Sequence, residues 1–289
     1  MKKFLAILLV FTFVLSFAGC DGDTTNTSSA ADTSGSASVT ESENESTAVS
    51  DTESTTAVVL KVATNAEFAP WEFIDDNQEI AGFDIDLVNA IGEKLNMTIE
   101  FSDMPFESVV ASIPTDACDI AASGLTINET RLQAVDFSEP YFDASQILIV
   151  KSDDAVFTGT TKDDIDAQLV GKKIGVCTNF TGEAYANGDE DWKFPGIADA
   201  EVKSYANISL AITDLLNGNV DVIIMDNTVA ELASKDNDSI KIVDVALTTE
   251  TYGIAIKKGN TELKEKIDNA IQELKDEGFI DSLLAKWLS

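Results

Sequence analysis

The stretch DIAASGLTINETRLQAVDF, residues 119–137, joins a short apolar segment to a helix start and contains the only arginine of the chain, Arg131. Its first part, DIAASG (119–124), has the pattern of a strand that ends in small residues, and a helix begins near Asn128 and Glu129. Backbone N–H groups at a helix start carry partial positive charge. Because open α/β sheets form their clefts beyond the carboxyl ends of their strands, this stretch predicts an anion site at a strand end.

Arg131 is the residue that points most directly to a ligand. A guanidinium offers a planar fork of donors that holds a carboxylate in two-point contact, which a lysine cannot do. The N–H groups of Gly124 and Thr126 lie close to the same helix start, so we expect them to face the cleft and to join Arg131 around one small carboxylate. The alternative interpretation is that Arg131 is a surface charge on its helix.

The same alternation of strands and helices extends over residues 58–289. GFDIDLVNAIGEKLN (82–96) has apolar residues at helical spacing, and Asp84 can cap its start. The alternation predicts an α/β protein of two lobes, each a mostly parallel sheet flanked by helices, with a cleft between the lobes. Further strands are predicted at 60–64, 97–104, 147–153, 172–178, 201–206, 220–226, 240–245 and 252–259, and further helices at 107–113, 208–219 and 262–278.

As a hypothesis, we assign an extent to each lobe. The first lobe comprises residues 58–150 and 250–289, and the second comprises residues 151–249. We expect the chain to cross between the lobes near 150–153 and 244–249.

Two other strand ends carry residues that suit a ligand. Phe68 lies in a loop after the first strand, where an exposed ring gives flat apolar contact to a ligand, whereas we expect Phe73 of the same loop to pack onto its own lobe. Thr181 and Gly182 follow a strand of the second lobe and can present N–H groups at a helix start.

Asp226 stands at the last position of an apolar strand in the second lobe. A carboxylate there is costly unless it faces a cleft or pairs with a cation, and its alternative role is to cap the next helix. An acid on one lobe and a guanidinium with N–H groups on the other would together bind an α-amino acid zwitterion.

The composition excludes several classes of function. The chain has 51 acidic and 19 basic residues, a formal net charge of -32 and no histidine. Such a polyanion is repelled by nucleic acid, and without histidine there is neither an imidazole metal ligand nor a Ser/His or Cys/His pair. We find no phosphate-binding loop or metal-ligand cluster and expect no cofactor or metal. Cys118 and Cys177 fall in different predicted lobes, so we expect two free, buried thiols.

The N-terminus predicts export and anchoring. Residues 1–20 have a charged start, an apolar run and small residues before Cys20, which resembles a bacterial lipoprotein signal in which Cys20 is lipidated; an ordinary signal peptide is the alternative. Residues 21–57 are rich in Ser, Thr and acids and lack aromatic residues, so they predict a disordered tether. We therefore expect a protein held by its N-terminal lipid on the extracellular face of the cell membrane or in a periplasm.

Several separate motifs, in the same order, resemble one family: GFDIDL, SGLTINETR, VDFSEPY, VDVIIMDN and the closing helices after YGIAIKKGN. Together they are similar to the extracellular solute-binding proteins of ABC importers, specifically the polar amino acid family with the type 2 periplasmic-binding fold. The likeness covers residues 60–289. It implies capture of an amino acid in the cleft and delivery to the transmembrane permease subunits by lobe closure, by a monomer with no enzymatic activity.

The resemblance also implies roles for particular residues. Arg131 would bind the ligand carboxylate and Asp226 its ammonium group. The neighbouring contacts that it implies are Ser123, Gly124 and Thr126 near the carboxylate, Phe68 as a lid with Phe106 below and Trp71 nearby, and Thr181 from the second lobe.

Two positions depart from the family pattern. Where binders of basic amino acids commonly have an aspartate this chain has Asn65, which favours a neutral or polar ligand, cystine included, unless Glu67 compensates. Where the family often reads Gly-Thr-Thr, this chain has Phe180 before Thr181, which narrows the pocket or adds apolar contact.

Two rival functions share this fold. A lyase or dehydratase would need an acid or base in the cleft, which only Glu67, Asp226 or Cys177 could supply. A ligand-sensing receptor subunit would have to signal through a partner, because no transmembrane segment follows the predicted lobes.

Overall fold

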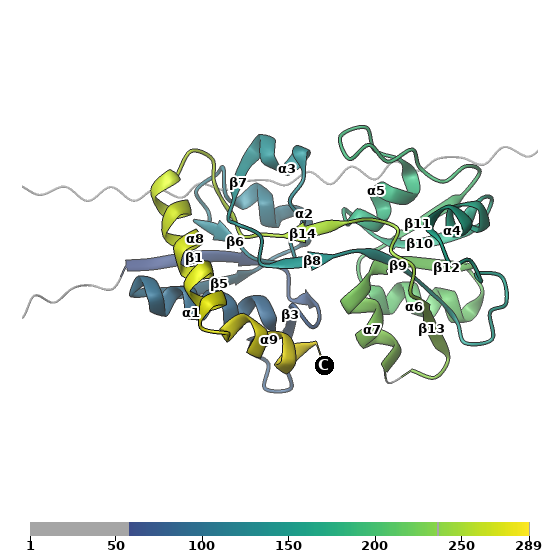
Figure 1. Cartoon of the computed structure of the whole chain (residues 1–289), viewed down its shortest axis with the longest axis horizontal. Helices are drawn as coiled ribbons and strands as arrows, with labels where there is room; N and C mark the ends of the chain where they lie inside the picture. Colours follow the sequence, from purple (N-terminus) through teal and green to yellow (C-terminus); the bar gives the residue numbers. More distant parts are fainter. Residues whose placement is uncertain (1–57, 236, 289) are drawn as a thin grey trace, which may run out of the picture. The chain divides into compact units, whose positions relative to one another are not determined.

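The computed structural model of the chain describes residues 58–235 and 237–288. The predicted signal peptide, Cys20 and the tether lie outside the described residues. Residues 58–288 contain two five-stranded sheets, each covered by helices, which we call the first and the second lobe (Figure 1).

The first lobe is built on a sheet with the strand order β5-β1-β6-β15-β7. β1 pairs in parallel with β5 and β6, whereas β15 pairs antiparallel with β6 and β7. Alternate residues of β1 face opposite layers: Leu60 and Val62 share a core with the helices α1, α8 and α9, and Ala63 faces the layer that contains α2. The elements are β1 (Val58–Thr64), α1 (Phe83–Leu95), β5 (Met97–Asp103), α2 (Phe106–Val109), the 3-10 turn η1 (Val110–Ser112), β6 (Ile120–Ala121), α3 (Glu129–Ala134), β7 (Val135–Phe137), β15 (Ala255–Lys257), α8 (Thr261–Asp276) and α9 (Phe279–Trp287).

The second lobe has a sheet of the order β11-β10-β12-β9-β13. β10 pairs in parallel with β11 and β12, and β9 pairs antiparallel with β12 and β13. The predicted two-lobed α/β fold is therefore confirmed, although parallel pairing is confined to three strands of each sheet. The elements are β9 (Gln146–Lys151), α4 (Lys162–Leu169), β10 (Lys173–Cys177), α5 (Thr181–Asn187), β11 (Glu201–Tyr205), α6 (Ile208–Asn217), β12 (Val222–Asp226), α7 (Asn227–Lys235) and β13 (Ile240–Val243).

Two antiparallel strands, β8 (Phe142–Ala144) and β14 (Glu250–Tyr252), connect the lobes and run side by side between the sheets (Figure 1). The crossover expected near 150–153 is therefore wrong, because β9 already belongs to the second sheet. A run of apolar residues before Lys151 reads as one strand, and its period does not show which sheet the strand joins.

The loop after β1 forms a small sheet of its own from β2 (Glu67–Phe68), β3 (Glu72–Ile74) and β4 (Ile80–Ala81). It leads into α1 through Gly82, whose φ of 136° places the glycine so close to Trp71 that a Cβ would be 2.2 Å from the Trp71 carbonyl oxygen. The prediction that Asp84 caps α1 is wrong: no side chain caps this helix, and Asp84 is fully buried in its first turn.

Cys118 and Cys177 are free and buried, as predicted. Among the described helices, none combines the length and the apolar character needed to cross a bilayer. The described residues also contain no group of side chains that could hold a metal ion.

Candidate functional site

A small cavity lies where strand ends of the two lobes meet. Its volume is about 10 Å³, so the side chains that line it nearly fill it in this structure. Its lining residues are Phe68, Phe106, Gly124, Thr126 and Arg131 from the first lobe and Phe180, Thr181 and Asp226 from the second. All of these residues are among those that the sequence predicts for the ligand, whereas the predicted residues Asn65, Trp71, Ser123 and Gly182 do not line this cavity.

Arg131 is held at the cavity by the first turn of α3. The Asn128 side chain caps this helix and accepts a hydrogen bond from the Arg131 backbone N–H at 2.7 Å. The guanidinium donates from Nη1 to the Thr126 carbonyl at 2.8 Å and lies 5.5 Å from the centre of the Phe106 ring. Burial lowers the pKa of Arg131 to about 10, against the attraction of Glu250 and Asp226, so the group remains charged at neutral pH.

The Thr126 backbone adds a donor beside the guanidinium. Thr126 opposes Tyr252 of β14 in an isolated antiparallel bridge, with the flanking bonds made by Ile127 N–H and Gly253 N–H. In such a pair the N–H and carbonyl of the central residue point away from the partner strand. The Thr126 N–H therefore points to the side where its carbonyl meets Arg131, and the two groups can bind one carboxylate.

Asp226 ends β12 on the opposite lobe and is 4% exposed. It accepts a short hydrogen bond from the Tyr252 hydroxyl. Burial, and next the negative charge of Glu250, raise the pKa of Asp226 to about 7. An ammonium group placed against this carboxylate would stabilise its charged form.

Glu250, at the start of β14, binds two residues of the cavity lining and is not predicted from the sequence. Its Oε2 accepts hydrogen bonds from Thr126 Oγ1 and Thr181 Oγ1, both at 2.8 Å, and its Oε1 accepts from Gln146 Nε2 at 3.1 Å and Thr248 Oγ1 at 2.6 Å. Because both threonines spend their hydroxyl protons on Glu250, their lone pairs are left to accept from a ligand ammonium group. The carboxylate of Glu250, on a strand that connects the lobes, thus binds Thr126 of the first lobe and Thr181 of the second.

Aromatic rings close the remaining side of the cavity. The Phe180 ring from the second lobe lies 5.1 Å from the ring of Phe68 and 4.5 Å from the ring of Phe106, between centres. Phe180 therefore occupies space between the two aromatic walls of the first lobe. Further contacts between the lobes include Thr130 Oγ1 to Asp191 Oδ2 at 2.8 Å and the ion pair of Lys193 with Glu129 at 3.3 Å.

Four predicted contacts are placed differently. Ser123 is fully buried and donates to Glu72 at 3.0 Å, and the Gly124 N–H donates to Asp84 at 2.8 Å, so neither group is directed at the cavity. Trp71 is also buried, and its indole N–H donates to Thr228 of the second lobe at 2.9 Å.

Gly182 does not line the cavity, because it packs against β12, where a Cβ would be 2.9 Å from the Ile224 carbonyl oxygen. The spacing of residues along the chain does not predict these four contacts, because each is made with a segment that is distant in the sequence.

Asn65 and Glu67 line an adjoining open cavity with Phe106, Asp103 and Glu107. The Asn65 side-chain amide donates to the Met104 carbonyl at 3.0 Å. Glu67, Asp103 and Glu107 give this cavity an acidic character.

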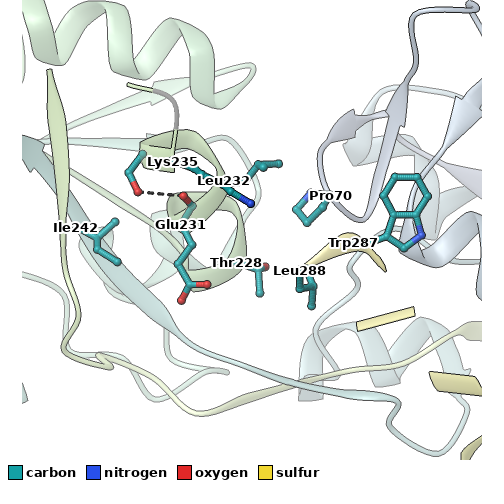
Figure 2. Close-up of a pocket in the computed structure, with 9 residues that line it drawn as sticks. Pro70, Thr228, Glu231, Leu232, Lys235, Ile242, Trp287 and Leu288 are labelled. Atoms are coloured by element: carbon teal, nitrogen blue, oxygen red, sulfur yellow. Dashed lines mark hydrogen bonds between the residues drawn. The ribbon is translucent and has the colours of Figure 1, made fainter. Parts of the chain in front are cut away.

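A separate cavity of about 320 Å³ lies between Pro70, Trp287 and Leu288 on one side and residues of α7 and β13 on the other (Figure 2). Figure 2 shows Leu232, Thr228 and Ile242 facing it from the second lobe. It contains neither Arg131 nor Asp226, so the groups suited to a zwitterion are not found there.

Comparison with known proteins identifies relatives along the whole described part of the chain. The family model of the bacterial extracellular solute-binding proteins, family 3, matches residues 60–289. A probable histidine-binding protein of Neisseria gonorrhoeae is 33% identical over 80% of this chain and 83% of its own length. A putative ABC transporter arginine-binding protein 2 of Escherichia coli is 31% identical over 81% of this chain and 92% of its own length.

Solved structures show the same likeness. An ancestral arginine-binding protein bound to arginine is 38% identical, with a TM-score of 0.70 over 80% of this chain and 98% of that one. The ancestral amino acid-binding protein AncCDT-1, a precursor of cyclohexadienyl dehydratase, is 30% identical, with a TM-score of 0.69 over 80% of this chain and 95% of that one.

Proposed function

Because the chain belongs to the bacterial extracellular solute-binding proteins, family 3, we propose that it captures an α-amino acid in the cavity between its lobes and delivers it to an ABC permease. One observation carries the proposal: Arg131 of the first lobe and Asp226 of the second line the same cavity. In this arrangement Arg131 and the Thr126 N–H bind the carboxylate, and Asp226 with the oriented threonine hydroxyls binds the ammonium group.

The same arrangement explains how binding would close the lobes. A ligand shifts a conformational equilibrium only when it binds one state more tightly than the other. A zwitterion held by Arg131 alone would gain nothing from closure. Held by Arg131 and Asp226 together, it stabilises the closed state, in which both groups face one cavity.

The side chain of the ligand is proposed to be neutral and polar. Asn65 offers an amide in place of a charge, and the Phe180 ring lies against the rings of Phe68 and Phe106, so a short side chain requires the least displacement of these rings. Cystine would require Phe180 to move away from Phe68 and Phe106.

A second candidate is a basic amino acid. The acids Glu67, Asp103 and Glu107 line the adjoining cavity, and a long cationic side chain passing Phe106 would reach them. Several relatives are named as arginine- or histidine-binding proteins.

A thermal-shift screen of the purified protein with the twenty amino acids and cystine tests the proposal and separates these ligand classes. A ligand that binds the native state raises the melting temperature, and calorimetry then gives its dissociation constant. Neutral ligands should give the largest shifts, and a dominant response to arginine, lysine or histidine would favour the second candidate. No shift with any of them would contradict amino-acid binding.

The Arg131→Lys variant tests the carboxylate site. Lysine keeps the charge and loses the planar fork, so the dissociation constant measured by calorimetry should rise at least tenfold, about 1.4 kcal/mol. An unchanged dissociation constant would contradict the assignment of Arg131.

The relatives are binding proteins rather than enzymes, and we propose the same for this chain. The likeness to AncCDT-1, a precursor of a dehydratase, is the observation that supports the dehydratase alternative. Burial raises the pKa of Cys177 to about 12, which makes it a poor base or nucleophile, and leaves Asp226 as the acid or base in the cavity. Mass spectrometry of a bound amino acid after prolonged incubation should show it unchanged.

We also propose that Cys20 is lipidated after removal of residues 1–19 and that residues 21–57 link the lipid to the lobes at the extracellular face of the cell membrane. The mature protein would act as a monomer. In the native host, the Cys20→Ala variant should shift from the membrane fraction to the soluble fraction, and retention in the membrane fraction would contradict lipid anchoring.

A further inference from the structure

Two acidic residues beneath the cavity, Glu72 of β3 and Asp84 of α1, are fully buried. Neither lines the cavity, yet both bond to the turn that does. The Glu72 Oε1 accepts from Ser123 Oγ at 3.0 Å, and the Asp84 Oδ2 accepts from the Gly124 N–H at 2.8 Å. Asp84 Oδ2 also accepts from the Tyr141 hydroxyl at 2.8 Å.

One oxygen of each acid has no donor. Among the described residues, Glu72 Oε2 and Asp84 Oδ1 are buried side-chain oxygens without a hydrogen-bond partner. The two carboxyl groups bind the adjacent residues Ser123 and Gly124, and each affects the pKa of the other. A single proton on Glu72 Oε2, donated to Asp84 Oδ1, would satisfy both oxygens.

The surroundings favour one proton on the pair. The described ion pairs include neither acid, and Tyr141 is the other titratable group that faces them. Two adjacent carboxylates without a cation cannot both be ionised in a buried site. Asp84 accepts two donated hydrogen bonds and Glu72 one, so the charge is better placed on Asp84. In agreement, burial and then repulsion by Asp84 raise the pKa of Glu72 well above its usual value.

We propose that Glu72 and Asp84 share one proton and that this pair positions the Ser123–Gly124 turn for ligand binding. Gly124 has a φ of 51°, and a Cβ there would be 2.6 Å from the Phe68 ring, so the turn packs directly on a wall of the cavity. Thr126, which bonds Arg131, follows two residues later. Both acids are therefore positioning residues, since they act through the turn rather than by touching the ligand.

The shared proton can be tested without a ligand, using Glu72→Gln. The amide of glutamine can donate to Asp84 Oδ1 and accept from Ser123, as a protonated glutamate would. Glu72 binds its proton more tightly in the folded state, so its contribution to stability is full below its unfolded pKa of about 4.3 and is lost as pH rises toward its folded pKa. The melting temperature of E72Q relative to that of the wild type should therefore increase as pH rises above about 4.3.

The matched control is Glu265→Gln, which changes an exposed glutamate on α8 and should leave the pH dependence as in the wild type. The infrared spectrum of the wild type at pH 7, minus that of E72Q, should show the carbonyl stretch of a buried protonated carboxylic acid, because the partly protonated Asp226 is common to both proteins and cancels in the difference. Parallel pH profiles of E72Q and wild type, or no such band, would overturn the shared proton.

The positioning role rests on the proposed function and is tested with the amino acid found by the screen. Glu72→Ala leaves the Ser123 hydroxyl proton without an acceptor and Asp84 Oδ1 without a donor, so the dissociation constant should rise about tenfold. E72Q should recover most of that loss, and its dissociation constant should depend less on pH than that of the wild type.

The outcomes of the two tests are distinguishable. An unchanged dissociation constant in E72A, or no recovery in E72Q, would overturn the positioning role. If the wild type bound no amino acid, the proposed function would fail while the stability and infrared measurements still decided the shared proton.

Discussion

At the scale of residues, the sequence predicts the lining of the cavity because the lining follows from topology. Arg131, Thr181 and Asp226 stand just after or at the ends of predicted strands, and such ends converge at the cleft of an α/β sheet. Glu250 was missed because it begins a short strand, with no motif around it. Ser123 and the Gly124 N–H were misplaced because their partners, Glu72 and Asp84, lie on segments that spacing does not bring near.

Asp226 should make ligand binding depend on pH. The ligand ammonium group needs the ionised carboxylate, whose pKa without ligand is raised to about 7 by burial and Glu250. The dissociation constant should therefore rise as pH falls below 7, by up to about tenfold per unit, with release of a proton on binding at pH 6. Calorimetry in buffers of different ionisation enthalpy measures that proton.

In the protein without ligand, the same raised pKa has the opposite effect on folding stability. The contribution of Asp226 to the free energy of unfolding decreases as pH rises from about 4 toward 7. Asp226→Asn should remove the proton release and weaken binding most above pH 7, with a difference from the wild type that narrows as pH falls. A pH-independent dissociation constant in the wild type would argue against Asp226 as the ammonium site.

Glu250 should matter for affinity although it is not among the residues that line the cavity. Glu250→Ala removes the oxygen that accepts from the hydroxyls of both Thr126 and Thr181, so neither hydroxyl is held in its present orientation. We expect the dissociation constant to rise about tenfold, which corresponds to about 1.4 kcal/mol. Calorimetry measures it, and an effect below twofold would show that the threonines do not need this orientation.

At the scale of elements, helices and strands with a clear period were predicted well, including α8, which ends before Gly278 in the left-handed conformation. Predictions failed where a short segment could belong to the sheet of either lobe. β9 is apolar along its whole length, so its pattern does not reveal that it joins the second sheet, and β8 and β14 are too short to show a period.

The cap of α3 should influence binding as well as stability. Asn128→Ala removes the acceptor of the Arg131 backbone N–H, which should lower stability by about 1 kcal/mol and the melting temperature by about 2–4 °C. It should also weaken ligand binding, because the cap holds the turn that carries the guanidinium. Thermal unfolding and calorimetry measure the two effects.

Asn207 provides the matched control. It caps α6 in the same way, accepting from the Leu210 N–H at 3.2 Å, and it does not line the cavity. Asn207→Ala should therefore lower the melting temperature by a similar amount without weakening binding. If Asn128→Ala and Asn207→Ala changed the dissociation constant equally, the α3 cap would have no specific role in ligand binding.

At the scale of the described lobes, closure is supported by contacts at the rim as well as by the cavity. Thr130 bonds Asp191, and Lys193 pairs with Glu129, from one lobe to the other. Each contact is exposed and contributes little by itself. Together they bias an equilibrium between open and closed forms, which small free energies can shift. The motifs of the sequence predicted two lobes, but nothing in their spacing pairs these particular rim residues.

Removing both rim contacts should favour the open form. In the Asp191→Ala/Lys193→Ala variant without ligand, small-angle X-ray scattering should give a larger radius of gyration than in the wild type. The dissociation constant should rise about threefold, because a smaller fraction of molecules is ready to close. Lys266→Ala, which breaks an ion pair within α8, is the control and should change neither quantity. Identical scattering of the rim variant and the wild type would contradict a role in closure.

The solitary guanidinium of this chain also gives it a natural reporter. A dicarbonyl reagent selective for arginine has a single target here, and Arg131 is partly buried between the lobes in the described arrangement. The rate at which Arg131 is labelled would therefore report how often the lobes open. A bound ligand would slow that labelling in proportion to the fraction of protein that it occupies. No probe needs to be introduced, because the residue that we propose to bind the carboxylate would itself report its release.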